Sequence, residues 1–111
     1  MIHLAFLIAA AEPTQTQVIG VGANSCGSFV DTRTQPFSRG IYVQWLVGFL
    51  MEFNITNRQG ILDAMGHTDK AGVEAWLDTY CSAHPLIPFA TASEALLVEL
   101  SGLERRAQGR K

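Results

Sequence analysis

The chain contains two cysteines, Cys26 and Cys81, and their placement constrains the fold more than any other feature of the sequence. In an oxidising compartment, the simplest arrangement for two cysteines in a small domain is a bond between them. Such a bond would close a loop of about 56 residues and stabilise the fold by about 4 kcal/mol. This is comparable with the net stability of many small domains, so we expect a chain of 111 residues to depend on it.

The beginning of the chain indicates export to such a compartment. Residues 2–11 are apolar except for His3, and this run is much shorter than the ~20 residues that a membrane span needs. It ends in three alanines, which suit a signal-peptidase site. We therefore predict a signal peptide over residues 1–11, a flexible segment over 12–24, a periplasmic or secreted location and no stable membrane insertion. No lysine or arginine precedes the apolar run, and a buried N-terminal helix is the alternative.

Other uses of the cysteines remain open in the sequence. His84 follows Cys81 by three residues, so a thiol and an imidazole would share one helix face, as in a nucleophilic pair. A metal site is less well supported because the sequence has no CxxC motif. No combination of serine, histidine and aspartate, and no pair of carboxylates within one motif, indicates catalysis. We predict that the chain is not an enzyme and that it has no catalytic residues, no metal site and no cofactor.

Two glycines ahead of Cys26, Gly20 and Gly22, are spaced as in a phosphate-binding loop. The third glycine and the following lysine of such loops are missing, and no alternation of strands and helices surrounds the motif. We expect the glycines to let the chain turn into a helix that begins at Cys26, with Asn24 or Ser25 as its N-cap. Residues 17–21 are predicted to form a short extended segment.

Apolar residues recur at intervals of three and four in several stretches, which is typical of amphipathic helices. The predicted helices cover residues 26–33, 37–53, 68–83 and 88–106, with a further turn or two over 60–65. Ser38 is the expected N-cap of the second helix, and Thr68 or Asp69 that of the third. Pro85 is expected to end the third helix.

These helices predict an all-α fold, a small bundle of four to five short helices stapled by one disulfide. A single helical domain is expected over residues 25–104, with a basic tail over 105–111. Four of the eight lysines and arginines lie in this tail, while all ten acidic residues lie before it. An acidic body does not suit a nucleic-acid partner, because binding to phosphates needs basic groups arrayed on a folded face.

The aromatic residues of the stretch 37–53 are the candidate site for binding a client or a partner. They are Tyr42, Trp45, Phe49 and Phe53. At helical spacing, such residues either form the core or line a surface for another molecule.

Three stretches of the sequence resemble the HdeA/HdeB-like family of small periplasmic proteins. They are SCGSF (residues 25–29), YVQWLVGFL (42–50) and WLDTYCSAHP (76–85). The resemblance implies a helical fold with a Cys26–Cys81 disulfide and an ATP-independent chaperone that is a homodimer at neutral pH. Acid would loosen it and expose apolar surface, including the aromatic residues named above, to unfolded protein clients.

A second family with similar features is that of the Tai-type immunity proteins. These are also small exported helical proteins with disulfides, and each neutralises a periplasmic toxin by binding it. This alternative predicts a stable folded surface and one specific protein partner, whereas the chaperone predicts exposure in acid and low specificity.

Overall fold

The computed structural model describes residues 18–57 and 68–109. Their α-helices are α2 (Cys26–Asp31), α3 (Pro36–Asn57), α5 (Lys70–Ala83) and α6 (Phe89–Gly109), and two 3-10 turns are η1 (Gly20–Ala23) and η2 (Thr32–Thr34). Within these ranges there is no strand, only an isolated bridge between Ser25 and Pro88. The predicted all-α fold with one disulfide is therefore confirmed.

Several predicted boundaries differ from the observed ones. α3 and α6 extend beyond their predicted C-terminal ends and contain 22 and 21 residues. α6 continues to Gly109, so most of the predicted basic tail belongs to this helix. The extended segment predicted over residues 17–21 is wrong from Gly20 onward, where the chain forms η1, whereas Ile19 has an extended backbone. The predicted signal peptide at 1–11 and the predicted turn at 60–65 lie outside the described residues.

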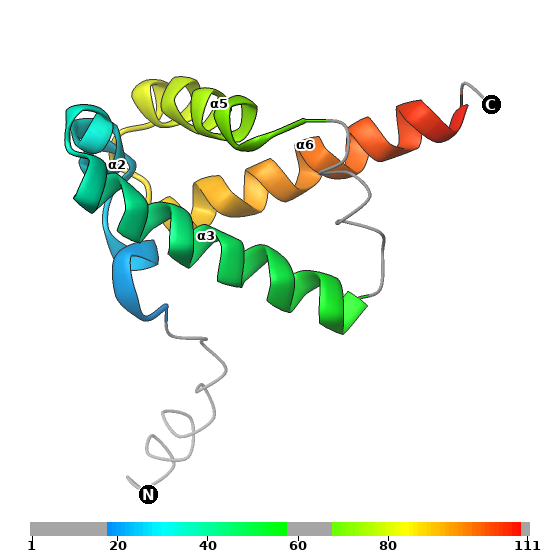
Figure 1. The fold of residues 1–111 in the computed structure, drawn as a ribbon, viewed down its shortest axis with the longest axis horizontal. Coiled ribbons are helices and arrows are strands. Elements are labelled where there is room, and N and C mark those ends of the chain that lie inside the picture. The colour runs from blue at the N-terminus through cyan, green and yellow to red at the C-terminus, as the bar shows by residue number, and fades with distance from the viewer. Residues whose placement is uncertain (1–17, 58–67, 110–111) are drawn as a thin grey trace, which may run out of the picture.

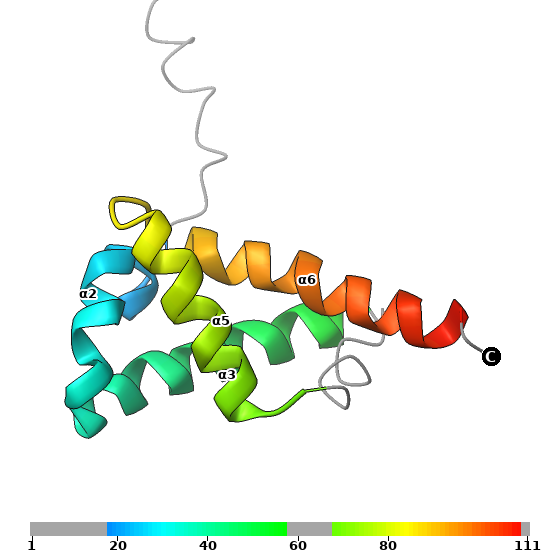
Figure 2. The same ribbon diagram turned by 90° about the horizontal axis from the view of Figure 1, so that it is seen from above.

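The helices meet at one end of the molecule (Figure 1). α2 lies there beside the beginnings of α3 and α6 and the end of α5 (Figure 2). In Figure 1, α3 and α6 diverge away from this end. Three backbone hydrogen bonds hold the entry of α2 against the connection between α5 and α6. They run from Cys26 N to Ile87 O (2.7 Å), Gly27 N to Pro85 O (2.9 Å) and Phe89 N to Asn24 O (2.7 Å).

The helix beginnings follow from local chemistry. Ser25 caps α2, because its hydroxyl accepts a hydrogen bond from Ser28 N, and Asp69 caps α5 by accepting from Gly72 N. Ser38 is not the N-cap of α3, and this prediction is wrong. The helix begins two residues earlier at Pro36, whose fixed φ and missing N–H suit the first helical position, and Arg39 N already donates to Gln35 O.

The core lies where the helices converge, and it is centred on aromatic rings. Phe89 stacks on Phe29 at 4.8 Å between ring centroids and meets the edge of Tyr42 at 5.1 Å. Aliphatic residues of α3, α5 and α6 continue this core along the bundle. The buried apolar residues are Cys26, Phe29, Tyr42, Leu46, Leu50, Val73, Leu77, Cys81, Phe89, Ala92, Leu96, Leu97 and Leu100.

Candidate functional site

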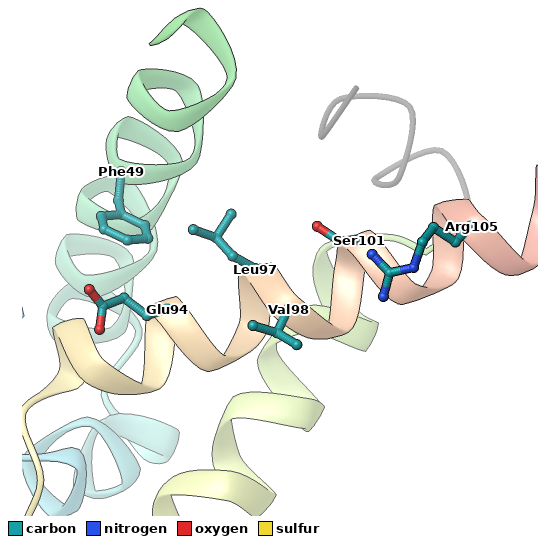
Figure 3. Close-up of a pocket in the computed structure, with 6 residues that line it drawn as sticks. All are labelled: Phe49, Glu94, Leu97, Val98, Ser101 and Arg105. Atoms are coloured by element: carbon teal, nitrogen blue, oxygen red, sulfur yellow. The ribbon is translucent and has the colours of Figure 1, made fainter. Parts of the chain in front are cut away.

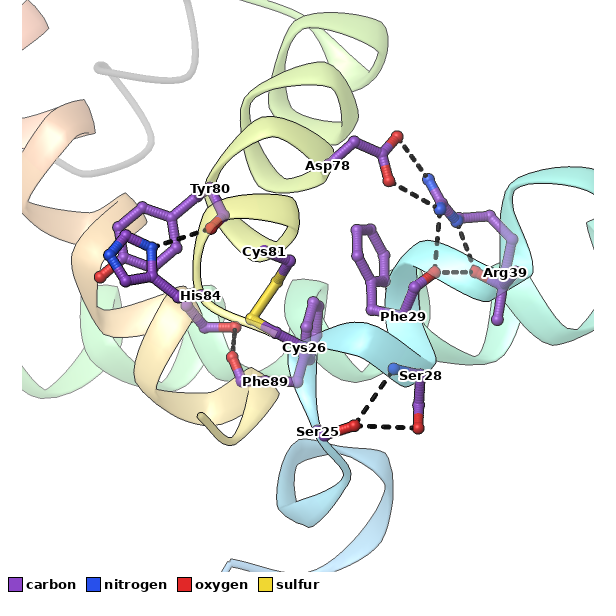
Figure 4. Close-up of a disulfide and its surroundings, with 12 residues drawn as sticks. Ser25, Cys26, Ser28, Phe29, Arg39, Asp78, Tyr80, Cys81, His84 and Phe89 are labelled. Carbon is purple, nitrogen blue, oxygen red and sulfur yellow. Dashed lines mark hydrogen bonds and ion pairs between the residues drawn. A yellow bond between two sulfur atoms is a disulfide. The ribbon is translucent and has the colours of Figure 1, made fainter. Parts of the chain in front are cut away.

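The disulfide between Cys26 and Cys81 joins the first turn of α2 to the last turn of α5 (Figure 4). Both cysteines are fully buried, and the chain has no free thiol. The alternative of a nucleophilic pair is therefore excluded. His84 instead stacks on the ring of Tyr80 at 4.5 Å, and its Nδ1 lies 3.0 Å from the Tyr80 carbonyl oxygen.

The four candidate aromatic residues of α3 occupy different environments. Tyr42 is buried, and its hydroxyl accepts a hydrogen bond from Asn24 Nδ2 at 3.1 Å. Trp45 and Phe49 are half-buried and stack on each other at 5.4 Å. The side chain of Phe53 lies outside the described residues. In the folded chain, the aromatic face is thus partly core, and its role in binding clients stays a prediction.

Gly20 and Gly22 of η1 allow the turn to pack closely against Trp45, which is a different role from binding a phosphate group. The indole Nε1 donates to Ile19 O at 2.9 Å, and the ring lies against the backbone of the turn. A Cβ on Gly22 would overlap the indole ring. Gly20 has φ +86°, a conformation that side chains disfavour, and a Cβ there would lie 3.3 Å from the indole Cδ1. The turn therefore requires glycine so that it can cover Trp45.

Replacing Gly22 with alanine is expected to destabilise the fold by about 1–3 kcal/mol, because either the turn or Trp45 must move. Urea unfolding measures the change. The matched control is Gly40→Ala, where a Cβ has open space within a helix and should stabilise by about 0.5–1 kcal/mol. Equal effects of the two substitutions would contradict the close packing of η1 on Trp45.

A buried arginine, Arg39, is the feature that the sequence analysis missed (Figure 4). Its guanidinium lies 3.9 Å from the ring centroid of Phe29 and forms two hydrogen bonds with Asp78, at 2.9 and 3.2 Å. The same group donates to Glu74 Oε1 at 3.2 Å. The remaining donors reach Thr32 Oγ1 at 2.8 Å and Phe29 O at 3.0 Å.

These five bonds form the Arg39 cluster, which consists of Arg39, Phe29, Thr32, Glu74 and Asp78. A guanidinium has five N–H donors, and each has a partner here. The partners belong to α2, η2 and α5, whereas the arginine belongs to α3. One side chain therefore connects α3 to three other elements.

The two carboxylates of the Arg39 cluster depend on cations. Burial disfavours the charged form of Glu74, but hydrogen bonds and charges from Lys70 and Arg39 outweigh this effect and hold its pKa below the ordinary value of 4.5. Glu74 and Asp78 also lie four residues apart on α5, where like charges repel each other. Arg39 relieves this repulsion by binding both.

α3 has an apolar surface on the side opposite the core. Phe37 is 83% exposed, Ile41 45% and Met51 42%, and all three share a helix face with Gly40 and Gly48. A helix that is apolar all round is usually buried on every side. This exposed face of α3, defined by Phe37, Ile41 and Met51, is therefore a second candidate binding surface.

Within residues 18–57 and 68–109, no group of three or more histidine, cysteine, aspartate or glutamate side chains is placed to hold a metal ion. None of the described helices combines the length and the apolar character that crossing a membrane requires. Comparisons with protein-family models, with curated proteins and with solved structures found no match to this chain.

Proposed function

We propose that this chain is an exported chaperone of the HdeA/HdeB-like kind, which holds unfolding proteins in acid without ATP. The observation that carries the proposal is the Arg39 cluster. α3 is joined to α5 through two carboxylates, and carboxylates lose their charge in acid. A buried guanidinium that loses its counter-charges is strongly destabilising, so acid favours release of α3.

The sign of the pH dependence follows from the lowered pKa of Glu74. A carboxyl group whose pKa is lower in the folded state stabilises the fold at pH values above its unfolded pKa. That stabilisation is lost as the pH falls through the folded value, which lies below 4.5. The charged groups that contact Arg39 are Glu74 and Asp78, while α2 and η2 contribute only an uncharged carbonyl and hydroxyl.

Release of α3 would expose apolar surface on both sides of one helix. Its core side carries Tyr42, Leu46 and Leu50, and its outer side carries Phe37 and Ile41. The disulfide would keep α2 and α5 joined, so the rest of the bundle would stay partly folded. In the acid form, the disulfide would still join α2 to α5, and the released α3 would expose its apolar side chains. Such an exposed apolar surface suits clients of varied sequence.

The charge of the chain in acid supports the same role. With its ten side-chain carboxyl groups protonated, the chain retains eight lysines and arginines, all positive and all outside the predicted signal peptide. Net charge of one sign keeps protein complexes apart and in solution. A client coated by this chain would therefore be protected against further association.

Binding of an apolar dye is expected to rise sharply between pH 7 and pH 2–3, because acid releases α3 from the Arg39 cluster. Circular dichroism measured in parallel reports whether the helices persist. Weak dye binding throughout this range, with helicity retained, would contradict the chaperone proposal. A rise only on reduction of the disulfide would also contradict it.

A Tai-type immunity protein is the second candidate, and the exposed face of α3 favours it. Phe37 is 83% exposed in the folded chain, which suits an anchor residue for one specific partner at neutral pH. This function predicts that one protein is captured at pH 7 and lost on Phe37→Asp. Capture that survives this substitution would argue against the exposed face of α3 as its binding surface.

A further inference from the structure

A groove of about 560 Å³ lies between α3 and α6 (Figure 3). Phe49 is its wall on α3, and Leu97 and Val98 form its apolar centre on α6. Val98 is 69% exposed although it is aliphatic and lies in the middle of a helix. The complete lining is Phe49, Glu94, Leu97, Val98, Ser101 and Arg105.

The two ends of the groove carry opposite charges. Glu94 lies at the end near Phe49, and Arg105 lies eleven residues further along α6, a distance of about 16 Å at 1.5 Å per residue. In the part of the chain that the structure describes, neither residue forms an ion pair. The groove therefore has an acidic end, an apolar centre and a basic end.

The spacing of the lining residues suits a second helix. Glu94, Val98 and Arg105 fall on one face of α6, with Ser101 between them, and a helix laid along this face can pack its ridges beside theirs. Eleven residues make just over three helical turns, so a partner helix with charges eleven residues apart presents both on its apolar face. Recognition of an amphipathic helix by an apolar groove is a common mode of binding.

We propose that this groove binds one amphipathic helix of a partner protein, which carries a basic residue opposite Glu94, apolar residues against Phe49 and Val98, and an acidic residue opposite Arg105. The site exists in the folded chain at neutral pH, so it does not require the release of α3 in acid. It differs from the exposed face of α3 in having an acidic residue at one end of its apolar centre and a basic residue at the other. Charge complementarity makes the site selective for the pattern of the helix and not only for its hydrophobicity.

Three capped helical peptides of about 16 residues test the proposal. All have leucines in the centre and differ in two charges placed eleven residues apart: one acidic and one basic, two basic, or two acidic. Calorimetry at pH 7 and low salt is expected to show that the wild-type protein binds the mixed peptide about tenfold more tightly than either other. A peptide with one acidic and one basic residue can bind in either direction, so reversing both charges of the groove together would not change which peptide is preferred. Each protein variant therefore reverses a single charge.

Each reversal is expected to change the preferred peptide. Arg105→Glu makes both ends acidic and should select the basic peptide, whereas Glu94→Lys makes both ends basic and should select the acidic one. Val98→Lys should weaken binding of the mixed peptide about tenfold by charging the apolar centre. Leu86→Lys is the matched control, because Leu86 is 92% exposed and lies outside the groove.

Two results would overturn the proposal. The first is the absence of binding, or equal binding of all three peptides by each protein. The second is self-association of the wild-type protein in sedimentation equilibrium that Val98→Lys removes, since the groove would then be occupied by a second copy of this chain.

Discussion

Replacing Arg39 with methionine is expected to lower the free energy of unfolding at pH 7 by about 3–5 kcal/mol. The substitution keeps a long side chain over Phe29 but leaves Glu74 and Asp78 facing each other without their shared cation. The buried Thr32 hydroxyl loses a donor as well. Urea unfolding of the oxidised protein measures the change.

Two variants make this prediction specific. Arg33→Met removes an exposed arginine of η2 and should change stability by less than about 0.5 kcal/mol. Arg39→Met combined with Asp78→Leu should recover part of the loss, because apolar packing replaces an unpaired charge. A loss below about 1 kcal/mol for Arg39→Met would indicate that the Arg39 cluster contributes no more than an exposed ion pair.

Reducing the disulfide is expected to destabilise the protein by about 4 kcal/mol, because the 55-residue separation of Cys26 and Cys81 makes the closed loop long. The bond lies beside the three backbone hydrogen bonds that hold the entry of α2, so α2 should separate first. Urea unfolding with and without reductant measures the loss, and the thermal transition should move down with it.

The double substitution Cys26→Ala and Cys81→Ala separates the bond from the packing of the sulfur atoms. Both side chains are fully buried, so this variant should be less stable than the reduced wild-type protein. Coincident unfolding curves for the oxidised and reduced proteins would contradict the role given to the disulfide.

The helices and the disulfide were predictable from the sequence because both depend on local or simple rules. Leu96, Leu97 and Leu100 recur at helical spacing, and all three are buried in α6. Ser25 and Asp69 are N-caps whose chemistry involves residues three positions away. The start of α3 differs from the predicted one because Pro36, whose fixed φ favours the first helical position, begins the helix ahead of Ser38.

The Arg39 cluster was not predicted because its ion pairs join residues 35 and 39 positions apart. Two signals were nevertheless present in the sequence. Arg39 is the only basic residue within the apolar stretch of α3, and Glu74 and Asp78 are acidic residues four apart on one predicted helix face. A lone cation in an apolar helix and a repelling pair of anions in another suggest each other as partners.

The groove between α3 and α6 could not be predicted from the sequence either. Val98 has the apolar character of a core residue and lies next to Leu97, which is buried, yet it is 69% exposed. Helical periodicity places Leu97 toward the core side of α6 and Val98 on its outer side. The sequence does not show that Phe49 of α3 lies beside this outer side, because that depends on how the helices cross.

The central claim is that acid frees α3 from the Arg39 cluster and that freed α3 holds clients. The most direct measurement is the aggregation of an unrelated client in the presence of the oxidised protein, at pH values from 7 to 2.5, for the wild type and for Arg39→Met. The account predicts that the wild type protects only below about pH 4, where its carboxylates become protonated, and that Arg39→Met protects at pH 7 as well. Absence of protection by the wild type at pH 2.5, or equal protection at pH 7 and 2.5, would contradict the claim.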